Sequence, residues 1–178
     1  MGCGGSVVDR KKSKQKKLNN QVKATCVIYG LPDRGQQQFA DSLNKTFMTT
    51  AFSQITYSFV VADSSRLSRK QWPKLYSEYE NVFITFYFPD LSSPGQTLLS
   101  VKSLNWLLTQ LKPEDPKPII IAKAKNAKEK PNLLTFQDRI PDDIQLYTPV
   151  DGEIEDAKKY YEMVNMASER IKITPDAK

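Results

Sequence analysis

Two glycines five positions apart are the feature of this 178-residue sequence closest to a site for phosphate chemistry. Gly30 and Gly35 follow a short apolar run and precede a glutamine-rich run, where a phosphate-binding loop of the form G-x-x-x-x-G-K-S/T would lie. Such a loop needs a lysine for the phosphate charge and a hydroxyl that holds Mg²⁺, but this chain has Gln36 and Gln37 there. Two glycines at this spacing also fit an ordinary turn between a strand and a helix.

Further polar residues stand at the expected ends of other strands. Asp33 and Arg34 lie inside the glycine loop, and Asp63 follows the second expected strand. Ligands of open parallel sheets bind outside the carboxyl ends of the strands, so these residues form one candidate nucleotide site. Arg34 is a candidate for supplying positive charge to a nucleotide; the alternative is a side chain that points into water.

The residue types that are missing exclude several reactions. The chain has no histidine and only two cysteines, Cys3 and Cys26. Ser-His-Asp and Cys-His catalysis, imidazole metal sites and a cysteine-built zinc cluster are therefore excluded. We expect no catalytic residues, no metal site and no cofactor, with GTP or GDP as the nucleotide ligands to consider.

The first residues predict a lipid anchor. Gly2 and Ser6 satisfy the N-myristoylation pattern, and Cys3 adds a thiol for palmitoylation beside the acylated end. One myristoyl chain binds a membrane only marginally, so stable binding needs a second signal. A basic cluster supplies one, because each cation contributes roughly 1 kcal/mol at an anionic leaflet. The cluster consists of Arg10, Lys11, Lys12, Lys14, Lys16 and Lys17.

The excess positive charge of the chain is confined to this start. The net charge is +6, and residues 1–23 carry seven cationic residues and one acidic residue, so the rest is balanced. This distribution favours a lipid-anchored protein on the cytoplasmic face of a membrane; a tail that only aids solubility is the simpler alternative. Nucleic-acid binding is disfavoured, because the tail lacks aromatic residues. We expect a flexible tail at 1–21, one domain at 22–172 and a disordered end at 173–178.

Alternating apolar runs and amphipathic runs predict the fold. The expected strands are residues 24–29, 55–62, 82–88, 117–122 and 144–148. The expected helices are one that ends near Met48 and three at 68–79, 97–111 and 152–171, with Thr97 as a cap and 122–130 as a solvated loop. Continuously apolar strands between helices indicate an α/β, doubly wound, mainly parallel five-stranded sheet with helices on both faces. The expected strand order is 2-1-3-4-5.

The run V-V-A-D-S-S-R-L at residues 60–67, with Trp72 behind it, is similar to the switch-two segment D-x-x-G-Q of small GTPases. On this run and the glycine loop, residues 24–171 resemble a small GTPase of the ADP-ribosylation-factor-like family. The start of the chain also resembles the acylated start of heterotrimeric G-protein alpha subunits. Only residues 49–54 separate the first helix from the second strand, too few for the family's switch one and extra strand. The resemblance therefore implies a P-loop GTPase-like fold without that edge strand.

The resemblance also implies a degenerate nucleotide site. Asp63 matches the family's aspartate, but Arg66 replaces the glycine that contacts the γ-phosphate and Leu67 replaces the glutamine that orients water. The family's base-recognition segment N-K-x-D aligns in two ways with this chain: with residues 126–129, where Asn126 and Glu129 keep an amide and a carboxylate, or with residues 123–126, which keep neither end. Since the loop also lacks its lysine and hydroxyl, we expect no GTP hydrolysis.

These observations together favour a membrane-anchored pseudo-GTPase that acts as a protein-interaction adaptor. The expected partner surfaces are the segment 63–79, with Arg66 and Leu67, and the loop 89–95. Trp72 is the expected anchor because tryptophan is frequent at binding hot spots; the alternative is a core residue. A second hypothesis is a guanine-nucleotide-binding switch that uses a rearranged site.

Overall fold

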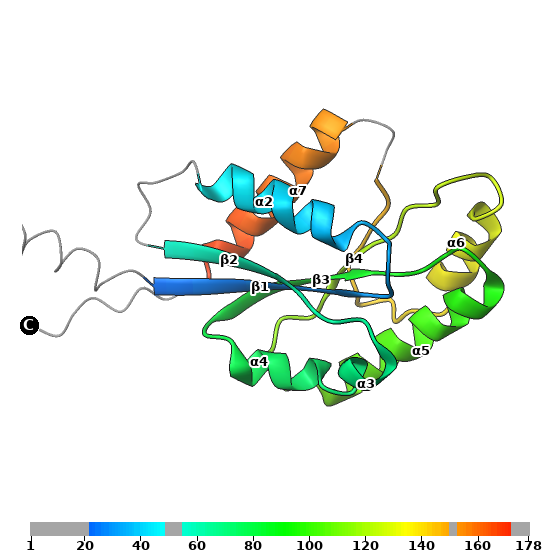
Figure 1. The fold of residues 1–178 in the computed structure, drawn as a ribbon, viewed down its shortest axis with the longest axis horizontal. Helices are drawn as coiled ribbons and strands as arrows, with labels where there is room; N and C mark the ends of the chain where they lie inside the picture. Colours follow the sequence, from blue (N-terminus) through cyan, green and yellow to red (C-terminus); the bar gives the residue numbers. More distant parts are fainter. Residues whose placement is uncertain (1–21, 49–54, 150–152, 172–178) are drawn as a thin grey trace, which may run out of the picture.

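The computed structural model describes residues 22–48, 55–149 and 153–171, so the predicted lipidation and basic residues lie outside the described residues. One sheet of five parallel strands has the order β2-β1-β3-β4-β5, which confirms the predicted fold class and strand order (Figure 1). The strands are β1 (Val22–Gly30), β2 (Ile55–Val61), β3 (Val82–Phe88), β4 (Ile119–Ile121) and β5 (Leu146–Tyr147). The helices are α2 (Gln36–Met48), α3 (Arg66–Arg69), the 3-10 turn η1 (Trp72–Lys74), α4 (Leu75–Glu78), α5 (Pro94–Gln110), α6 (Lys130–Gln137) and α7 (Glu153–Ser168).

The first strand, β1, is an interior strand of the sheet. It pairs with β2 on one side and with β3 on the other, and its residues from Ala24 to Gly30 are buried. A continuously apolar run suits a parallel strand that is covered on both faces. Cys26 lies opposite Phe59 of β2 and Ile84 of β3. Its thiol is fully buried, and burial raises its pKa well above the usual value.

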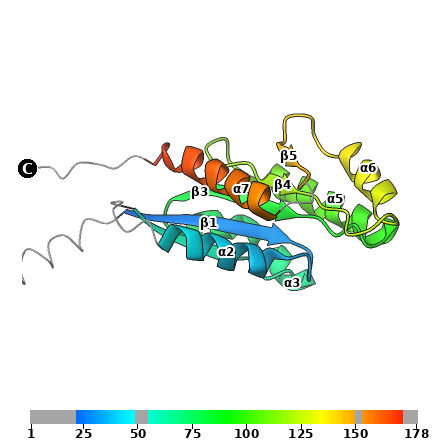
Figure 2. The same ribbon diagram turned by 90° about the horizontal axis from the view of Figure 1, so that it is seen from above.

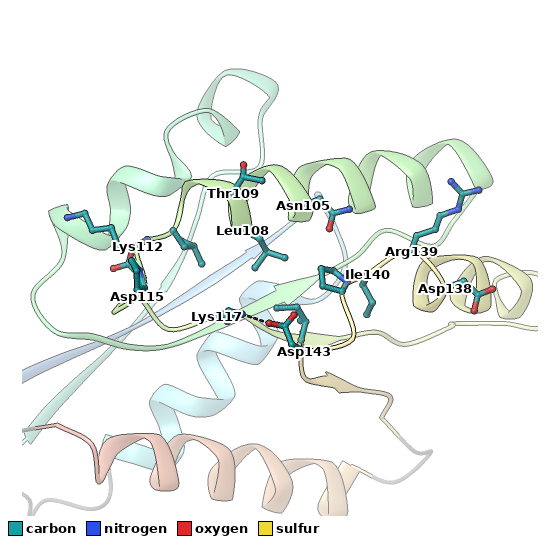
Figure 3. Close-up of a pocket in the computed structure, with 14 residues that line it drawn as sticks. Asn105, Leu108, Thr109, Lys112, Asp115, Lys117, Asp138, Arg139, Ile140 and Asp143 are labelled. Carbon is teal, nitrogen blue, oxygen red and sulfur yellow. Dashed lines mark hydrogen bonds and ion pairs between the residues drawn. The ribbon is translucent and has the colours of Figure 1, made fainter.

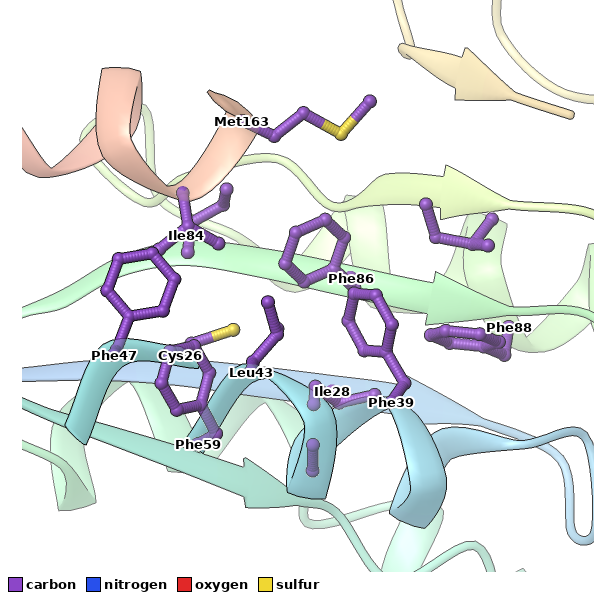
Figure 4. Packing of buried hydrophobic residues seen from close by; sticks show 13 residues of the cluster. Cys26, Ile28, Phe39, Leu43, Phe47, Phe59, Ile84, Phe86, Phe88 and Met163 are labelled. Atoms are coloured by element: carbon purple, nitrogen blue, oxygen red, sulfur yellow. The ribbon is translucent and has the colours of Figure 1, made fainter. Parts of the chain in front are cut away.

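Helices α2 and α7 cover one face of the sheet (Figures 1 and 2). Phe39, Leu43 and Phe47 lie at helical spacing on α2 and pack into the core on this face (Figure 4). The ring of Phe39 lies 5.0 Å from that of Phe86 in β3 and 4.8 Å from that of Tyr160 in α7, edge to face in both cases. Aromatic packing of this kind adds to the hydrophobic gain from burial. It fixes α2 and therefore the glycine loop that leads into it.

Helices α3, α4 and α5 cover the other face (Figure 1), and α6 adds Phe136 to the core on this face. Trp72 is 1% exposed there, and its ring lies 5.3 Å from that of Tyr29 and 6.2 Å from that of Tyr87. Leu104 and Leu107 of α5 are fully buried in the same cluster. The prediction of Trp72 as an exposed partner anchor is therefore wrong. Its large apolar ring is part of the core, as the alternative interpretation holds.

Two helices depart from their predicted bounds for identifiable reasons. The helix predicted at 68–79 is divided into α3, η1 and α4, because Pro73 lacks a backbone N–H and its ring clashes with the preceding turn. The helix predicted to be capped by Thr97 begins earlier, at Pro94. Its N-cap is Ser93, whose hydroxyl accepts a hydrogen bond from a backbone N–H of the first turn.

The last part of the sheet is smaller than predicted. β4 has 3 residues and β5 has 2, compared with the predicted runs 117–122 and 144–148. The loop predicted at 122–130 leads into α6, a helix that was not predicted. Its first turn contains Pro131, which is tolerated there because a backbone N–H at this position would have no partner within the helix. Within the described ranges, no helix is both long and apolar enough to cross a membrane.

Candidate functional site

The predicted nucleotide site corresponds to the carboxyl edge of the sheet. Because β1 to β4 are parallel, the loops that follow them lie at the same edge, and β1 borders both β2 and β3. The glycine loop, residues 30–35, leads directly into α2 at Gln36. The structure brings the loop into contact with residues after β3 and β4 that are distant in the sequence, as described below.

Gln36 closes the glycine loop from the inside. Its side chain is buried; Oε1 accepts a hydrogen bond from the Arg34 backbone N–H at 3.0 Å, and Nε2 donates to the Leu31 carbonyl. In a phosphate-binding loop, the backbone N–H groups point at the phosphate and the lysine neutralises its charge. In this chain the neutral side-chain amide of Gln36 occupies the lysine position, and its Oε1 already accepts the hydrogen bond of the Arg34 backbone N–H.

The two glycines are required by the backbone of this turn. Gly30 has φ 151°, and a Cβ at this position would lie 2.5 Å from the Phe88 carbonyl oxygen. Gly35 has φ 98°, and Asp33 has φ 59°, a left-handed conformation that aspartate tolerates. The Leu31 N–H donates to the same Phe88 carbonyl at 3.3 Å. Glycine is therefore needed here for a tight turn against β3, which accounts for Gly30 without a phosphate.

Two carboxylates hold the Arg34 side chain. One guanidinium nitrogen lies 3.1 Å from Glu129 Oε2 and another lies 3.4 Å from Asp90 Oδ1. The three side chains are 10%, 6% and 14% exposed, so the alternative in which Arg34 points into water does not hold. The formal charge of the three is −1, which disfavours an anion beside Arg34. Asp90 is not among the predicted site residues, although its position directly after β3 is a signal that points to it.

The predicted base-recognition residues are engaged in a local turn. Asn126 Oδ1 accepts hydrogen bonds from the backbone N–H groups of Lys128 and Glu129, at 3.0 and 3.2 Å. Glu129 Oε2, besides its ion pair, accepts from the Lys125 backbone N–H at 2.9 Å. Lys125 Nζ donates to the Asp33 carbonyl at 3.2 Å, which ties this turn to the glycine loop. The amide oxygen and the carboxylate thus have partners within the protein.

Asp63, the residue that matches the family's aspartate, organises the start of α3. Its carboxylate accepts hydrogen bonds from the Ser68 hydroxyl at 2.6 Å and from the Ser65 backbone N–H at 2.9 Å. These donors lower the pKa of Asp63 below its usual value. Gln37, at the position of the Mg²⁺-holding hydroxyl, donates instead to Asp41 Oδ1 at 2.9 Å on the surface of α2.

Among the cavities lined by described residues, two at this edge of the sheet border the predicted site residues. One, of about 350 Å³, lies between the glycine loop and the end of β2, and none of its lining residues is a lysine or arginine. The other, of about 150 Å³, lies beside Arg34, Lys125 and Tyr160. Small-molecule sites commonly measure about 300–1,000 Å³. Of these two, the larger cavity has no cation for a triphosphate, and the smaller cavity, which has cations, is small for a nucleotide.

The other predicted partner residues lie at the surface. Leu67 is 78% exposed, and in the loop 89–95 Leu91 is buried while Gly95 is exposed. Arg66 borders a groove of about 400 Å³ between α3 and α5, which we call the α3–α5 groove. The groove is lined by Arg66, Arg69, Lys70, Lys102, Ser103 and Trp106. Trp106 is not among the predicted partner residues, although Lys102 and Trp106 lie four residues apart on one helix face.

Comparison with known proteins adds no family assignment: no protein-family model matches the chain, and no curated protein matches it significantly.

Proposed function

We propose that this chain is a membrane-anchored adaptor, built on a GTPase-like fold, that does not hydrolyse GTP and that binds acidic protein segments in the α3–α5 groove. The lipidation residues Gly2 and Cys3 and the basic cluster attach it to the cytoplasmic face of a membrane. The described domain then presents the groove to partners.

The closed glycine loop is the observation that carries the first part of this proposal. Phosphoryl transfer depends on positive charge and preorganised donors at the phosphates. Gln36 occupies the lysine position and the Arg34 N–H, while the Arg34 guanidinium is paired with Glu129 and Asp90. Losing one preorganised donor commonly costs about 2.7–4 kcal/mol in an enzyme, and several are replaced here. The geometry therefore favours a structural loop over a catalytic one.

The charge of the α3–α5 groove supports the partner chemistry. Four of its six lining residues are cationic, and none is acidic. Among the described residues, no carboxylate forms an ion pair with any of these four cations. Trp106 is 37% exposed beside them, and tryptophan is a frequent anchor of protein interfaces. An acidic peptide with one large apolar side chain complements both properties.

A nucleotide titration tests the absence of GTP binding. Purified full-length chain is heated with and without 1 mM GTP or GDP and Mg²⁺, and no rise in melting temperature is expected. A ligand present at about 100 times its Kd would stabilise the fold by about 2.7 kcal/mol, or about 5–10 °C for a domain of this size. A rise of that size, or co-purified GDP, would support the nucleotide-switch hypothesis instead.

A peptide titration tests the groove. The probe is a fluorescein-labelled peptide of aspartates and glutamates around one phenylalanine, and the control peptide carries lysines in their place. We expect saturable anisotropy with the acidic peptide only, and a loss of affinity of at least about tenfold in Lys102→Glu and Trp106→Ala. Lys112→Glu, an exposed charge reversal beyond the end of α5, is the matched control and should bind as the native chain does. Equal binding by all four proteins would contradict the docking site.

Flotation with vesicles tests the anchor. Chain co-expressed with N-myristoyltransferase should float with vesicles that contain phosphatidylserine, and Gly2→Ala should not. Replacement of the six basic residues by glutamine should weaken binding to anionic vesicles but not to neutral ones, because each cation contributes roughly 1 kcal/mol only at an anionic surface. Unchanged flotation of Gly2→Ala would reject the lipid anchor.

A further inference from the structure

A cavity of about 780 Å³ lies at the opposite edge of the sheet from the glycine loop. It is bordered by the last turns of α5, the segment 111–117 that precedes β4, and the segment 138–144 between α6 and β5 (Figure 3). Its volume is larger than that of either cavity at the carboxyl edge and falls within the range of small-molecule sites. None of the residues assigned to the proposed function lines it.

The walls of this cavity are mainly apolar. The apolar lining residues are Leu108, Leu111, Pro113, Ile140, Pro141 and Ile144. Several of them also pack against the core cluster on this face of the sheet, so the floor of the cavity is continuous with the core. An apolar, concave surface of this kind favours an occupant with an apolar body, since burying that body removes hydrophobic surface from water.

One polar atom in the wall lacks a partner. Asn105 Oδ1 is buried and accepts no hydrogen bond from any described residue. Asn105 and Leu108 extend from α5 toward the segment that carries Ile140 (Figure 3). Buried acceptors in proteins are nearly always hydrogen-bonded, because an acceptor that gives up its hydrogen bonds to water and gains none in the protein destabilises the fold. A ligand that donates one hydrogen bond would satisfy this oxygen.

The charges at the rim of the cavity are balanced. Lys117 forms an ion pair with Asp143, and that pairing lowers the pKa of Asp143 below its usual value (Figure 3). Asp115 Oδ2 accepts a hydrogen bond from the Lys112 backbone N–H at 2.8 Å. The rim has three cations and three carboxylates in all. The cations are Lys112, Lys117 and Arg139, and the carboxylates are Asp115, Asp138 and Asp143. The cavity therefore has no net charge that would select an ion.

We propose that this cavity is a binding site for a small uncharged molecule with an apolar, ring-sized body and one N–H or O–H donor, which bonds to Asn105 Oδ1. The site is independent of nucleotide binding, of the membrane anchor and of the α3–α5 groove. The cavity and the groove share one helix: α5 contributes Asn105 to the cavity and Trp106 to the groove.

Two matched probes test the site on the full chain. Indole carries one N–H donor on an apolar body, and 1-methylindole has the same body without the donor. Each is titrated into ¹⁵N-labelled protein, and amide shifts of the lining residues are followed by NMR. We expect both probes to shift these resonances and indole to bind about five- to tenfold more tightly, the value of one neutral hydrogen bond.

Variants separate the hydrogen bond from the shape of the cavity. Asn105→Leu should bind both probes equally, whereas Gln110→Leu, a similar change outside the cavity, should keep the native preference. Leu108→Trp should fill the cavity and abolish binding of both. Equal affinities of the two probes in the native chain, or shifts that do not map to the lining residues, would overturn the proposal. Shifts of the same resonances with protein concentration alone would assign this surface to a second copy of the chain and would also overturn it.

Discussion

Removal of the Arg34 side chain should be markedly destabilising. Arg34→Met leaves Glu129 and Asp90 without their cation, in side chains that are only 6% and 14% exposed. Breaking a fully buried ion pair from one side costs about 3–5 kcal/mol. Glu129 keeps the hydrogen bond from the Lys125 N–H, and Asp90 retains some contact with water, so we expect a loss of about 2–3 kcal/mol.

Urea unfolding measured by circular dichroism gives the free energy of unfolding for this comparison. A loss of 2–3 kcal/mol corresponds to a fall in melting temperature of about 4–12 °C for a domain of this size. Arg34→Met with Glu129→Gln should recover at least about 1 kcal/mol, because the second change removes the uncompensated charge. Lys117→Met, which removes an ion pair whose partners are 58% and 64% exposed, is the control and should cost less than about 0.5 kcal/mol. If Arg34→Met is no more destabilising than that control, the internal ion-pair interpretation of the site is incorrect.

Three further predictions concern the loop and the core. Gly30→Ala should lower the free energy of unfolding by at least about 2 kcal/mol in urea unfolding, since its φ is 151° and an added Cβ meets a backbone carbonyl at 2.5 Å. Gly95→Ala, on a helix where an added Cβ would meet only Ser93 Oγ at 4.0 Å, should not lower it. Trp72→Ala should cost about 3–5 kcal/mol, and Leu67→Ala should change the free energy of unfolding by less than about 0.5 kcal/mol in the same assay. Burial raises the pKa of Tyr76 to about 12, whereas its pKa in the unfolded chain is about 10. The stability that the neutral Tyr76 contributes is therefore present below pH 10 and is lost as the pH rises from about 10 to about 12. Measured by urea unfolding at each pH, Tyr76→Phe should lose less stability across this window than the native chain does.

The sequence predicts the sheet well because its signals are local and strong. The runs at β1 and β3 are long and continuously apolar, and the glycine turn after β1 has a steric cause that one residue type satisfies. Pro73 shows the limit of such reasoning, because one helix is predicted across it at 68–79 and the structure divides this segment into α3, η1 and α4. The short helix α6 has no strong periodicity, so packing decides it.

The site is less predictable because its partners are distant in the sequence. Arg34 and Glu129 are separated by 95 positions, and no spacing rule connects a loop after β1 with a turn after β4. The replacement of lysine by Gln36 is plain in the sequence, but the use of its amide to close the loop is visible only in three dimensions. Likewise, the groove cations Arg66, Arg69 and Lys70 lie more than thirty positions before the fourth, Lys102 in α5.

The burial of Cys26 simplifies a test of the acylation proposed at Cys3. Thiol reagents attack the thiolate, and a fully buried thiol with a raised pKa forms almost none while the domain is folded. Of the two cysteines in the chain, a maleimide dye added under native conditions would therefore report on Cys3 alone. Dye uptake compared with uptake after unfolding would then count the molecules whose Cys3 carries no fatty acid, without mass spectrometry of the lipid itself.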